Sequence, residues 1–121
     1  MLANVRAISH VGLEGQLIEI EADIHNGLPA FIIVGMASKA VDEAKERVRG
    51  ALKNSNLNLP PRRITLNLAP ADLPKNGSGF DLAMAVSLLV ASGQVEAVQK
   101  DSVFFGELAL DGSTRAVSGA L

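Results

Sequence analysis

The sequence of 121 residues contains no cysteine, no tryptophan and no tyrosine, and only four phenylalanines. Without cysteine there is no disulfide, no thiolate metal ligand and no cysteine nucleophile. Proteins stack the bases of single strands on aromatic side chains, so the scarcity of these side chains argues against that mode of recognition. No apolar run approaches the roughly 20 residues of a membrane-spanning helix, and the N-terminus lacks a signal peptide's apolar core. We therefore expect a cytoplasmic protein without membrane contact.

The charged residues give the chain a formal net charge of −2, and acids and bases are mixed along its length. This balance argues against a strongly basic nucleic-acid-binding protein but still allows a local basic patch. A length of 121 residues is enough for one domain that buries its own core without a metal or a disulfide.

Hydrophobic periodicity predicts the secondary structure. Strands are expected over 1–12, 16–25, 30–34, 63–68, 103–110 and 113–117, and a helix over 38–54. The turn signal Asn26-Gly27 predicts that the strand 16–25 folds back onto 30–34, whose continuous apolar run is typical of a central strand. Asp111-Gly112 predicts a two-residue hairpin. Helices that cover a largely antiparallel sheet make the expected fold class α+β.

The stretch 73–93 is the one around which the chain is organised. It begins with a loop rich in glycine and continues as a helix, 80–92, that is apolar on every face. Such a helix must be buried on all sides, so we expect it at the centre of the domain, with Gly93 as its C-terminal stop. Because glycine loops that lead into buried helices often form active sites, this loop is the first candidate site.

The motifs in and after this stretch resemble known families. The residues LPKNGSGFDLAMAVSLL and FGELALDGSTRAVSGAL resemble the proteolytic domain of Lon proteases. The blocks VGLEGQLIEIEADIHNGLPAFIIVGM and ALKNSNLNLPPRRITLNLAPADLPKNGSGFDLAMA resemble, more closely, the N-terminal domain of the magnesium-chelatase-like AAA+ ATPases of bacteria, the YifB/ComM group. This second resemblance covers essentially the whole chain.

The resemblance implies a fold like domain 2 of ribosomal protein S5, shared with Lon protease domains, in which two helices accompany a mixed sheet. It implies that residues 1–121 are a single ChlI-like domain of a longer protein, with an AAA+ ATPase module after residue 121. ATP and magnesium would belong to that module, with no cofactor or metal in this domain. The expected partners are this module and DNA, in a full-length homo-hexamer. ComM-type members are competence proteins that move DNA branch points in natural transformation.

The residues themselves test whether a Lon-type site is present. That site needs a serine at the helix start and a lysine that accepts its proton. Aligned on the shared motifs, the serine position falls on Gly79 and the lysine position on Leu121. Ser78 lies one residue early, which rotates a side chain by about 100° at a helix start. Both members of the dyad are absent, so we expect a non-catalytic domain that serves assembly or contact with DNA or a partner.

The alternative is an enzyme that uses the loop at 76–79, either a divergent serine-dependent peptidase or a phosphate-binding enzyme. Backbone N–H groups at a helix N-terminus favour anions. The candidates for a phosphate-binding loop are Lys75, Asn76, Gly77, Ser78 and Gly79. The chain contains no GxxxxGK[ST] motif, so no P-loop is expected.

A cluster of basic residues is the candidate surface for DNA or a partner. It comprises Arg47, Arg49, Lys53, Arg62 and Arg63, at the end of the first helix and the start of the next strand. Contacts to phosphates need no base recognition, although the same residues also suit a solvated face. His10 and His25 lack metal-ligand spacing and are expected on the surface.

Overall fold

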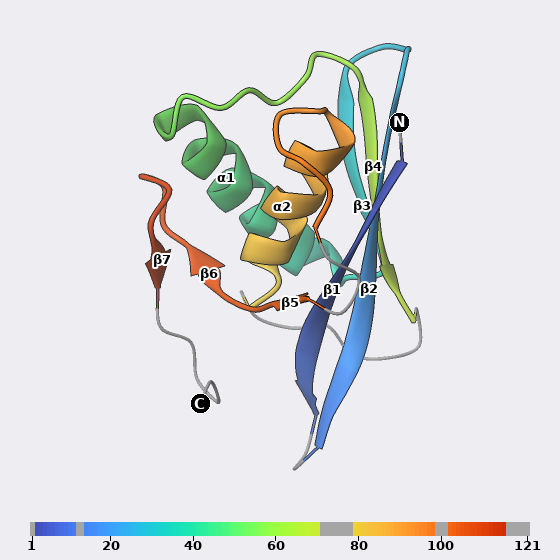
Figure 1. Cartoon of the computed structure of the whole chain (residues 1–121), viewed down its shortest axis with the longest axis vertical. Helices are drawn as coiled ribbons and strands as arrows, with labels where there is room; N and C mark the ends of the chain where they lie inside the picture. Colours follow the sequence, from blue (N-terminus) through green and yellow to red (C-terminus); the bar gives the residue numbers. More distant parts are fainter. Residues whose placement is uncertain (1, 12–13, 71–78, 99–101, 116–121) are drawn as a thin grey trace.

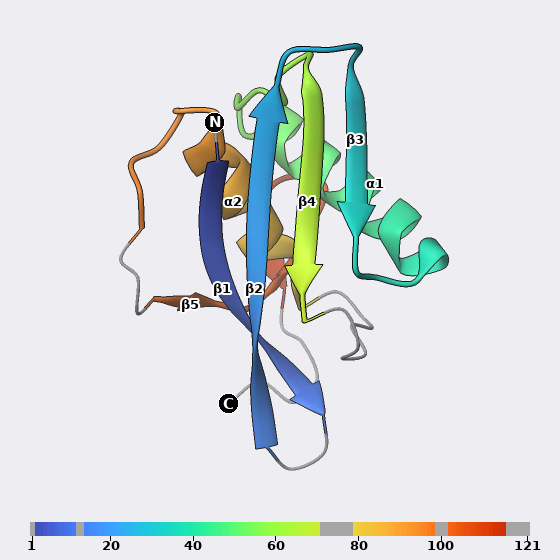
Figure 2. The same ribbon diagram turned by 90° about the vertical axis from the view of Figure 1, so that its right-hand side faces the viewer.

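Two helices pack on one face of a mixed sheet. The computed structural model of the chain describes residues 2–11, 14–70, 79–98 and 102–115. Its elements are β1 (Leu2–Val11), β2 (Glu14–His25), β3 (Ala30–Val34), α1 (Ser38–Asn54), β4 (Arg63–Ala69), α2 (Asp81–Ala91), β5 (Val103–Phe104), β6 (Glu107–Leu108) and β7 (Thr114–Arg115). Figure 1 shows the sheet nearly on edge with both helices on one side, and Figure 2 shows its other face. The predicted α+β class, with two helices and a mixed sheet, is confirmed.

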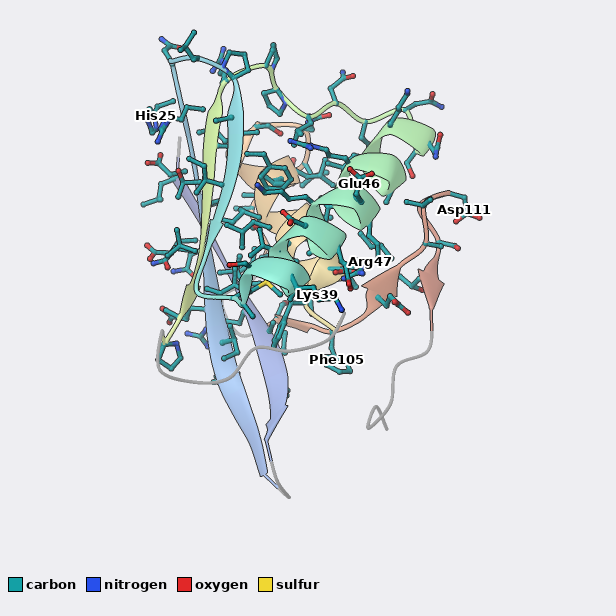
Figure 3. All side chains as sticks on the ribbon, turned by 180° about the vertical axis from the view of Figure 1, so that it is seen from behind. His25, Lys39, Glu46, Arg47, Phe105 and Asp111 are labelled. Carbon is teal, nitrogen blue, oxygen red and sulfur yellow. The ribbon has the colours of Figure 1, made fainter. Side chains whose placement is uncertain are left out.

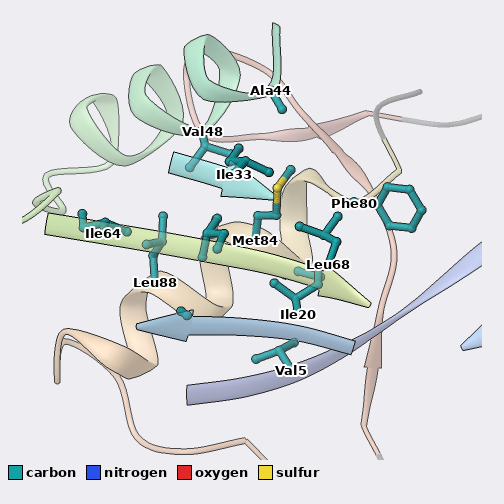
Figure 4. Close-up of a cluster of buried hydrophobic side chains, with 14 of the residues drawn as sticks. Val5, Ile20, Ile33, Ala44, Val48, Ile64, Leu68, Phe80, Met84 and Leu88 are labelled. Carbon is teal, nitrogen blue, oxygen red and sulfur yellow. The ribbon is translucent and has the colours of Figure 1, made fainter. Parts of the chain in front are cut away.

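The five-stranded sheet has the order β3-β4-β2-β1-β5. β2 runs antiparallel to both β1 and β4, whereas β3–β4 and β1–β5 are parallel pairs. Alternate residues of each long strand point toward the helices, as the period of two predicts. The buried side chains of the strands include Val5, Ile20, Leu66 and Leu68, which meet Val48 and Met84 of the two helices in one core (Figure 4).

The helix α2 occupies the centre, as predicted. It packs against β1, β2, α1 and β6, and each of its side chains is buried or half-buried. Its C-terminus is a Schellman motif, in which Gly93 (φ +78°) donates its N–H to the carbonyl of Val90 and Gln94 donates to that of Leu89. The predicted stop at Gly93 is therefore confirmed, and it has a defined hydrogen-bonding role.

The position of β3 corrects two predictions. The strand 16–25 does not fold back onto 30–34, because β4 lies between β2 and β3. β3 is consequently an edge strand and not a central one. The helix α1 connects β3 to β4, so the two strands run parallel, as a crossover connection requires. The apolar run at 31–34 reflects the burial of Phe31 and Ile33 under α1, while Val34 on the other face is 48% exposed.

The short connection between β3 and α1 packs closely against β4. Gly35 has a φ of +98°, and a Cβ atom built on it would overlap the carbonyl oxygen of Leu68 in the neighbouring strand β4. Ser38 is the first helical residue of α1, and the N-cap position belongs to Ala37. Gly35 is thus required both by its backbone conformation and by its contact with β4.

The segment after residue 102 also departs from its prediction. The single strand expected over 103–110 is divided into β5 and β6, because Gly106 bonds to the start of α2 and not to a strand. The hairpin of β6 and β7 is at the predicted place, but its loop is 109–113 and not the two residues Asp111-Gly112. The Asp111 carboxylate accepts hydrogen bonds from the N–H and the hydroxyl of Ser113, which stabilises this longer loop. In the described part of the chain, neither helix is long and apolar enough to cross a membrane.

Candidate functional site

A buried ion pair joins the two helices. The guanidinium of Arg47 in α1 donates to the carboxylate of Asp81 in α2 through two bonds, Nε to Oδ2 at 2.5 Å and Nη2 to Oδ1 at 3.2 Å. The backbone N–H of Leu108 donates to the same Oδ2 at 3.2 Å. The Asp81 side chain is 1% exposed and that of Arg47 is 21% exposed. One carboxylate therefore holds α1, α2 and β6 together.

The surroundings shift the pKa of both members of this pair. Burial raises the pKa of the Asp81 carboxyl above its ordinary value, and the hydrogen bond from Arg47 opposes that shift without cancelling it. The hydrogen bond to Asp81 raises the pKa of Arg47. Arg47 also lies 3.9 Å from Glu43, one helical turn earlier. With its guanidinium turned inward (Figure 3), Arg47 does not belong to a basic surface, which corrects that part of the predicted patch.

The start of α2 is where the serine of a Lon-type dyad would lie and where the candidate phosphate-binding loop ends. Gly79 accepts a hydrogen bond at its carbonyl from the N–H of Gly106, and Leu82 in the first turn donates its N–H to the carbonyl of Gly106. A Cβ atom on Gly79 would lie 2.6 Å from the ring of Phe105. A serine side chain at this position therefore requires the ring to move. Residues 75–78 and Leu121 lie outside the described residues, so the rest of the loop and the lysine position stay predictions.

Three of the five predicted basic residues lie together. Arg49 and Lys53 of α1 line an open hollow of 490 Å³ with the connection 55–62, and Arg49 and Arg62 line an adjoining hollow of 230 Å³ beside the start of β3. We call these two hollows, with Arg49, Lys53 and Arg62, the basic groove. No acidic residue lines either hollow. In the described part of the chain, the ion pairs involve Arg47 and His25, and none involves a cation of the groove.

The fifth predicted residue, Arg63, lies outside the groove. Its neighbour Ile64 is buried under the helices, so the exposed Arg63 projects from the other face of the sheet, where it is paired in register with His25. His25 is half-exposed and its Nδ1 lies 3.5 Å from Asp23. Among the described residues no group of three histidine or acidic side chains is arranged to hold a metal ion.

The walls of the basic groove are fixed by hydrogen bonds that the sequence did not reveal. Asn56 (φ +59°) ends α1 in a second Schellman motif, in which Leu57 donates its N–H to the carbonyl of Leu52. The side-chain amide of Gln94 makes two hydrogen bonds to the backbone of Asn58. Its Oε1 accepts from the Asn58 N–H at 3.0 Å, and its Nε2 donates to the Asn58 carbonyl at 2.7 Å. An asparagine just after a helix is a sequence signal for a Schellman motif. No signal in the sequence predicts that Gln94 binds a residue 36 positions away.

The groove presents cations and amides but no exposed aromatic ring. The guanidinium of Arg49 lies 5.4 Å from the centre of the Phe31 ring, and Lys45 lies 5.9 Å from it. Phe31 is only 4% exposed, so its ring cannot stack on a nucleotide base. The groove is therefore suited to binding anionic groups such as phosphates, without recognition of bases.

Comparison with known proteins gives consistent matches. Residues 20–121 match the family described as "Subunit ChlI of Mg-chelatase". The chain is similar to the "Competence protein ComM" of Haemophilus influenzae, with 46% identity over 121 residues, and to the uncharacterized protein YifB of Escherichia coli, with 44% identity over the same length. YifB of Salmonella typhimurium is 46% identical. Each match covers 99% of this chain and 24% of the relative, so the chain spans about a quarter of the length of these relatives.

Proposed function

Because the chain belongs to the ChlI family of magnesium-chelatase subunits and is of the ComM/YifB type, we propose that it is a non-catalytic domain that contacts the phosphate backbone of DNA through its basic groove. The observation that carries the proposal is the set of three cations, Arg49, Lys53 and Arg62, with no acidic residue in either hollow. Contacts of this kind require no base recognition. A relative named as a competence protein agrees with a role on DNA.

The wider proposal concerns the whole protein. The domain would accompany an AAA+ ATPase module that binds ATP and magnesium, in a homo-hexamer that moves DNA branch points during natural transformation. The finer fold class, like domain 2 of ribosomal protein S5 and the Lon protease domain, belongs to the same proposal. It is supported by a mixed sheet with two helices on one face. Within this scheme the domain binds DNA while the other module hydrolyses ATP.

Salt dependence tests the contact with DNA. Three phosphate contacts predict a slope of about −2.7 for the logarithm of the association constant against that of the salt concentration, equivalent to a loss of about 40-fold between roughly 50 and 200 mM salt. The measurement is fluorescence anisotropy of a labelled duplex. In the variant R49Q/K53Q/R62Q we expect at least a tenfold lower affinity at low salt, and a slope near zero, because the phosphates lose their partners.

The matched control is R6Q/K39Q/R63Q, which removes the same charge from positions outside the groove. It should keep the slope, because only long-range attraction is lost. Equal losses in both variants would mean that net charge and not the groove binds DNA. If the unaltered chain does not bind duplex or branched DNA at low salt, the DNA contact is wrong. Circular dichroism verifies that each variant is folded.

The non-catalytic half of the proposal has its own test. We expect no cleavage of unfolded, labelled casein by the chain, and no difference between the chain and its S78A variant. The reason is that Gly79 has no side chain and the ring of Phe105 lies only 2.6 Å from where a Cβ atom would be. Cleavage that disappears in S78A would refute this expectation and revive the serine-dependent peptidase.

The phosphate-binding alternative is examined by thermal unfolding with millimolar nucleotide or inorganic phosphate. A ligand at 100 times its dissociation constant adds about 2.7 kcal/mol of stability. At the start of α2, the Leu82 N–H is bonded to Gly106 and the first turn carries the carboxylate of Asp81. Both features are unfavourable for an anion at the loop, so we expect no shift of the melting temperature in the variant R49Q/K53Q/R62Q, which lacks the cations of the basic groove.

A further inference from the structure

The edge strand β3 has none of the usual protections against pairing with another strand. Its sequence AFIIV contains no charge and no proline, and no described residue pairs with its outer side. Proteins commonly protect exposed edges with lysine, proline, bulges or a covering segment. In Figure 2 β3 is the outermost strand of the sheet. Such an edge can accept another strand through main-chain hydrogen bonds.

The hydrogen-bonding groups at this edge can be identified. Ala30 donates its N–H to the carbonyl of Arg62, so it points toward β4. Alternate residues of a strand point their backbone groups to opposite sides, and Ile32 and Val34 therefore also bond to β4. The N–H and carbonyl groups of Phe31 and Ile33 are directed outward. These four groups fit an antiparallel strand.

We propose that β3 pairs with β3 of a second copy of this chain, antiparallel about a twofold axis at Ile32. In this register Phe31 of each copy forms a hydrogen-bonded pair with Ile33 of the other, which gives four hydrogen bonds. Val34 lies opposite Ala30, and the two Ile32 side chains lie side by side on the face away from the helices. Every pairing is apolar against apolar. The strand is therefore complementary to itself, and the two sheets become one sheet of twice the width.

The helix α1 supports a second copy as the partner. Figure 2 shows that α1 crosses behind the sheet at an angle, with its first turns beyond β3 and its last turns behind β4. A twofold axis at Ile32 therefore places the N-terminal half of one α1 beside the C-terminal half of the other. The exposed charged residues of the N-terminal half are Lys39, Asp42, Glu43 and Glu46, of which three are acidic, and those of the C-terminal half are Arg49 and Lys53. The two α1 helices thus bring a net-acidic half beside a basic half, so a second copy and DNA phosphates would compete for Arg49 and Lys53.

The absence of cysteine makes a direct test possible. In the proposed dimer the two Ile32 residues form a non-hydrogen-bonded pair, whose Cα atoms lie about 4.5 Å apart, within the range of a disulfide. The variant I32C should form a disulfide-linked dimer under mild oxidation. The matched control is T65C, which lies in the same row of the sheet but one strand inward. It should stay monomeric.

Sedimentation of the 121-residue chain over a concentration series gives the second measurement. We expect a monomer–dimer equilibrium that I32K shifts to monomer, because two like charges would meet at the axis. T65K, with the same substitution one strand inward, should leave the equilibrium unchanged. The proposal is overturned if the chain stays monomeric at all concentrations, if I32K dimerises as the unaltered chain does, or if I32C and T65C cross-link equally. None of these outcomes depends on whether the chain binds DNA.

Discussion

Replacing Arg47 by methionine is expected to lower the free energy of unfolding by about 3–5 kcal/mol, because the variant leaves the buried carboxylate of Asp81 without its cation. Methionine retains the apolar stem that packs between the helices, so the loss reports the charge and not the packing. The carboxylate is 1% exposed and cannot recover its hydration without opening the contact of α1 with α2. The measurement is urea unfolding followed by circular dichroism.

The pH dependence of this loss identifies its origin. Burial raises the pKa of Asp81 above the ordinary value of 3.8, so the folded chain holds this proton more tightly than the unfolded chain does. Asp81 therefore favours folding most below pH 3.8, and this contribution falls as the pH rises through its raised folded pKa. Without Arg47 the pKa rises further. The cost of R47M should be largest at neutral pH and should shrink on acidification.

A double-mutant cycle completes this test. The variant D81N keeps an oxygen that accepts the N–H of Leu108, and Arg47, whose side chain is 21% exposed, can turn to solvent, so D81N should cost less than R47M. The double variant R47M/D81N should recover most of the loss, because no charge stays buried without a partner. Costs that simply add would mean that Arg47 and Asp81 stabilise the chain independently, and the bridging role assigned to Asp81 would be wrong.

Gly35→Ala is expected to cost about 2–5 kcal/mol, of which about 1–2 come from the positive φ and about 1–3 from the overlap of its Cβ with the backbone of Leu68. A neighbouring backbone carbonyl in the middle of a sheet cannot rotate away as the end of a side chain can. β3 would have to separate from β4, or α1 would have to begin elsewhere. Thermal and urea unfolding measure the loss.

Gly93→Ala is the matched control for this prediction. Gly93 also has a positive φ, +78°, but a Cβ atom there meets nothing within 4 Å. Its substitution should therefore cost only the conformational part, about 1–2 kcal/mol. If the two alanine variants lose the same stability, the contact of Gly35 with Leu68 is unimportant and the backbone conformation alone requires glycine.

The sequence predicted the elements well where a single periodic pattern covers many residues. The bounds of α1 and the strands β1 to β4 agree with their predictions within a few residues, because each buries one face. The sequence did not predict that β4 lies between β2 and β3, or that the strand expected over 103–110 is divided into two. Asn26-Gly27 is a local turn signal and contains no information on which strand will be the neighbour. Gly106 is not part of a strand, because its carbonyl accepts an N–H from the first turn of α2. This hydrogen bond joins segments that are distant in the sequence, so no local pattern predicts it.

The candidate site was predicted less completely. Arg49, Lys53 and Arg62 lie together in the structure, because Arg49 and Lys53 are one helical turn apart and the connection from α1 to Arg62 is short. Arg47 was assigned to the same surface because its charge looked solvated, and its partner is 34 residues away. Nothing in the sequence near Asp81 indicates that its carboxylate is fully buried.

The parallel pairing of β1 with β5 affects how this chain must fold. Arg6 and Ala7 pair with Val103 and Phe104, so almost the entire sequence separates the two partners. Closing so long a loop is entropically slow and precedes any gain from the contacts it makes. During synthesis the hairpin of β1 and β2 leaves the ribosome early, while β5, which completes its outer side, is made only after α2. Folding should therefore be slow relative to a helical domain of this size, with β1 exposed to chaperones until β5 arrives.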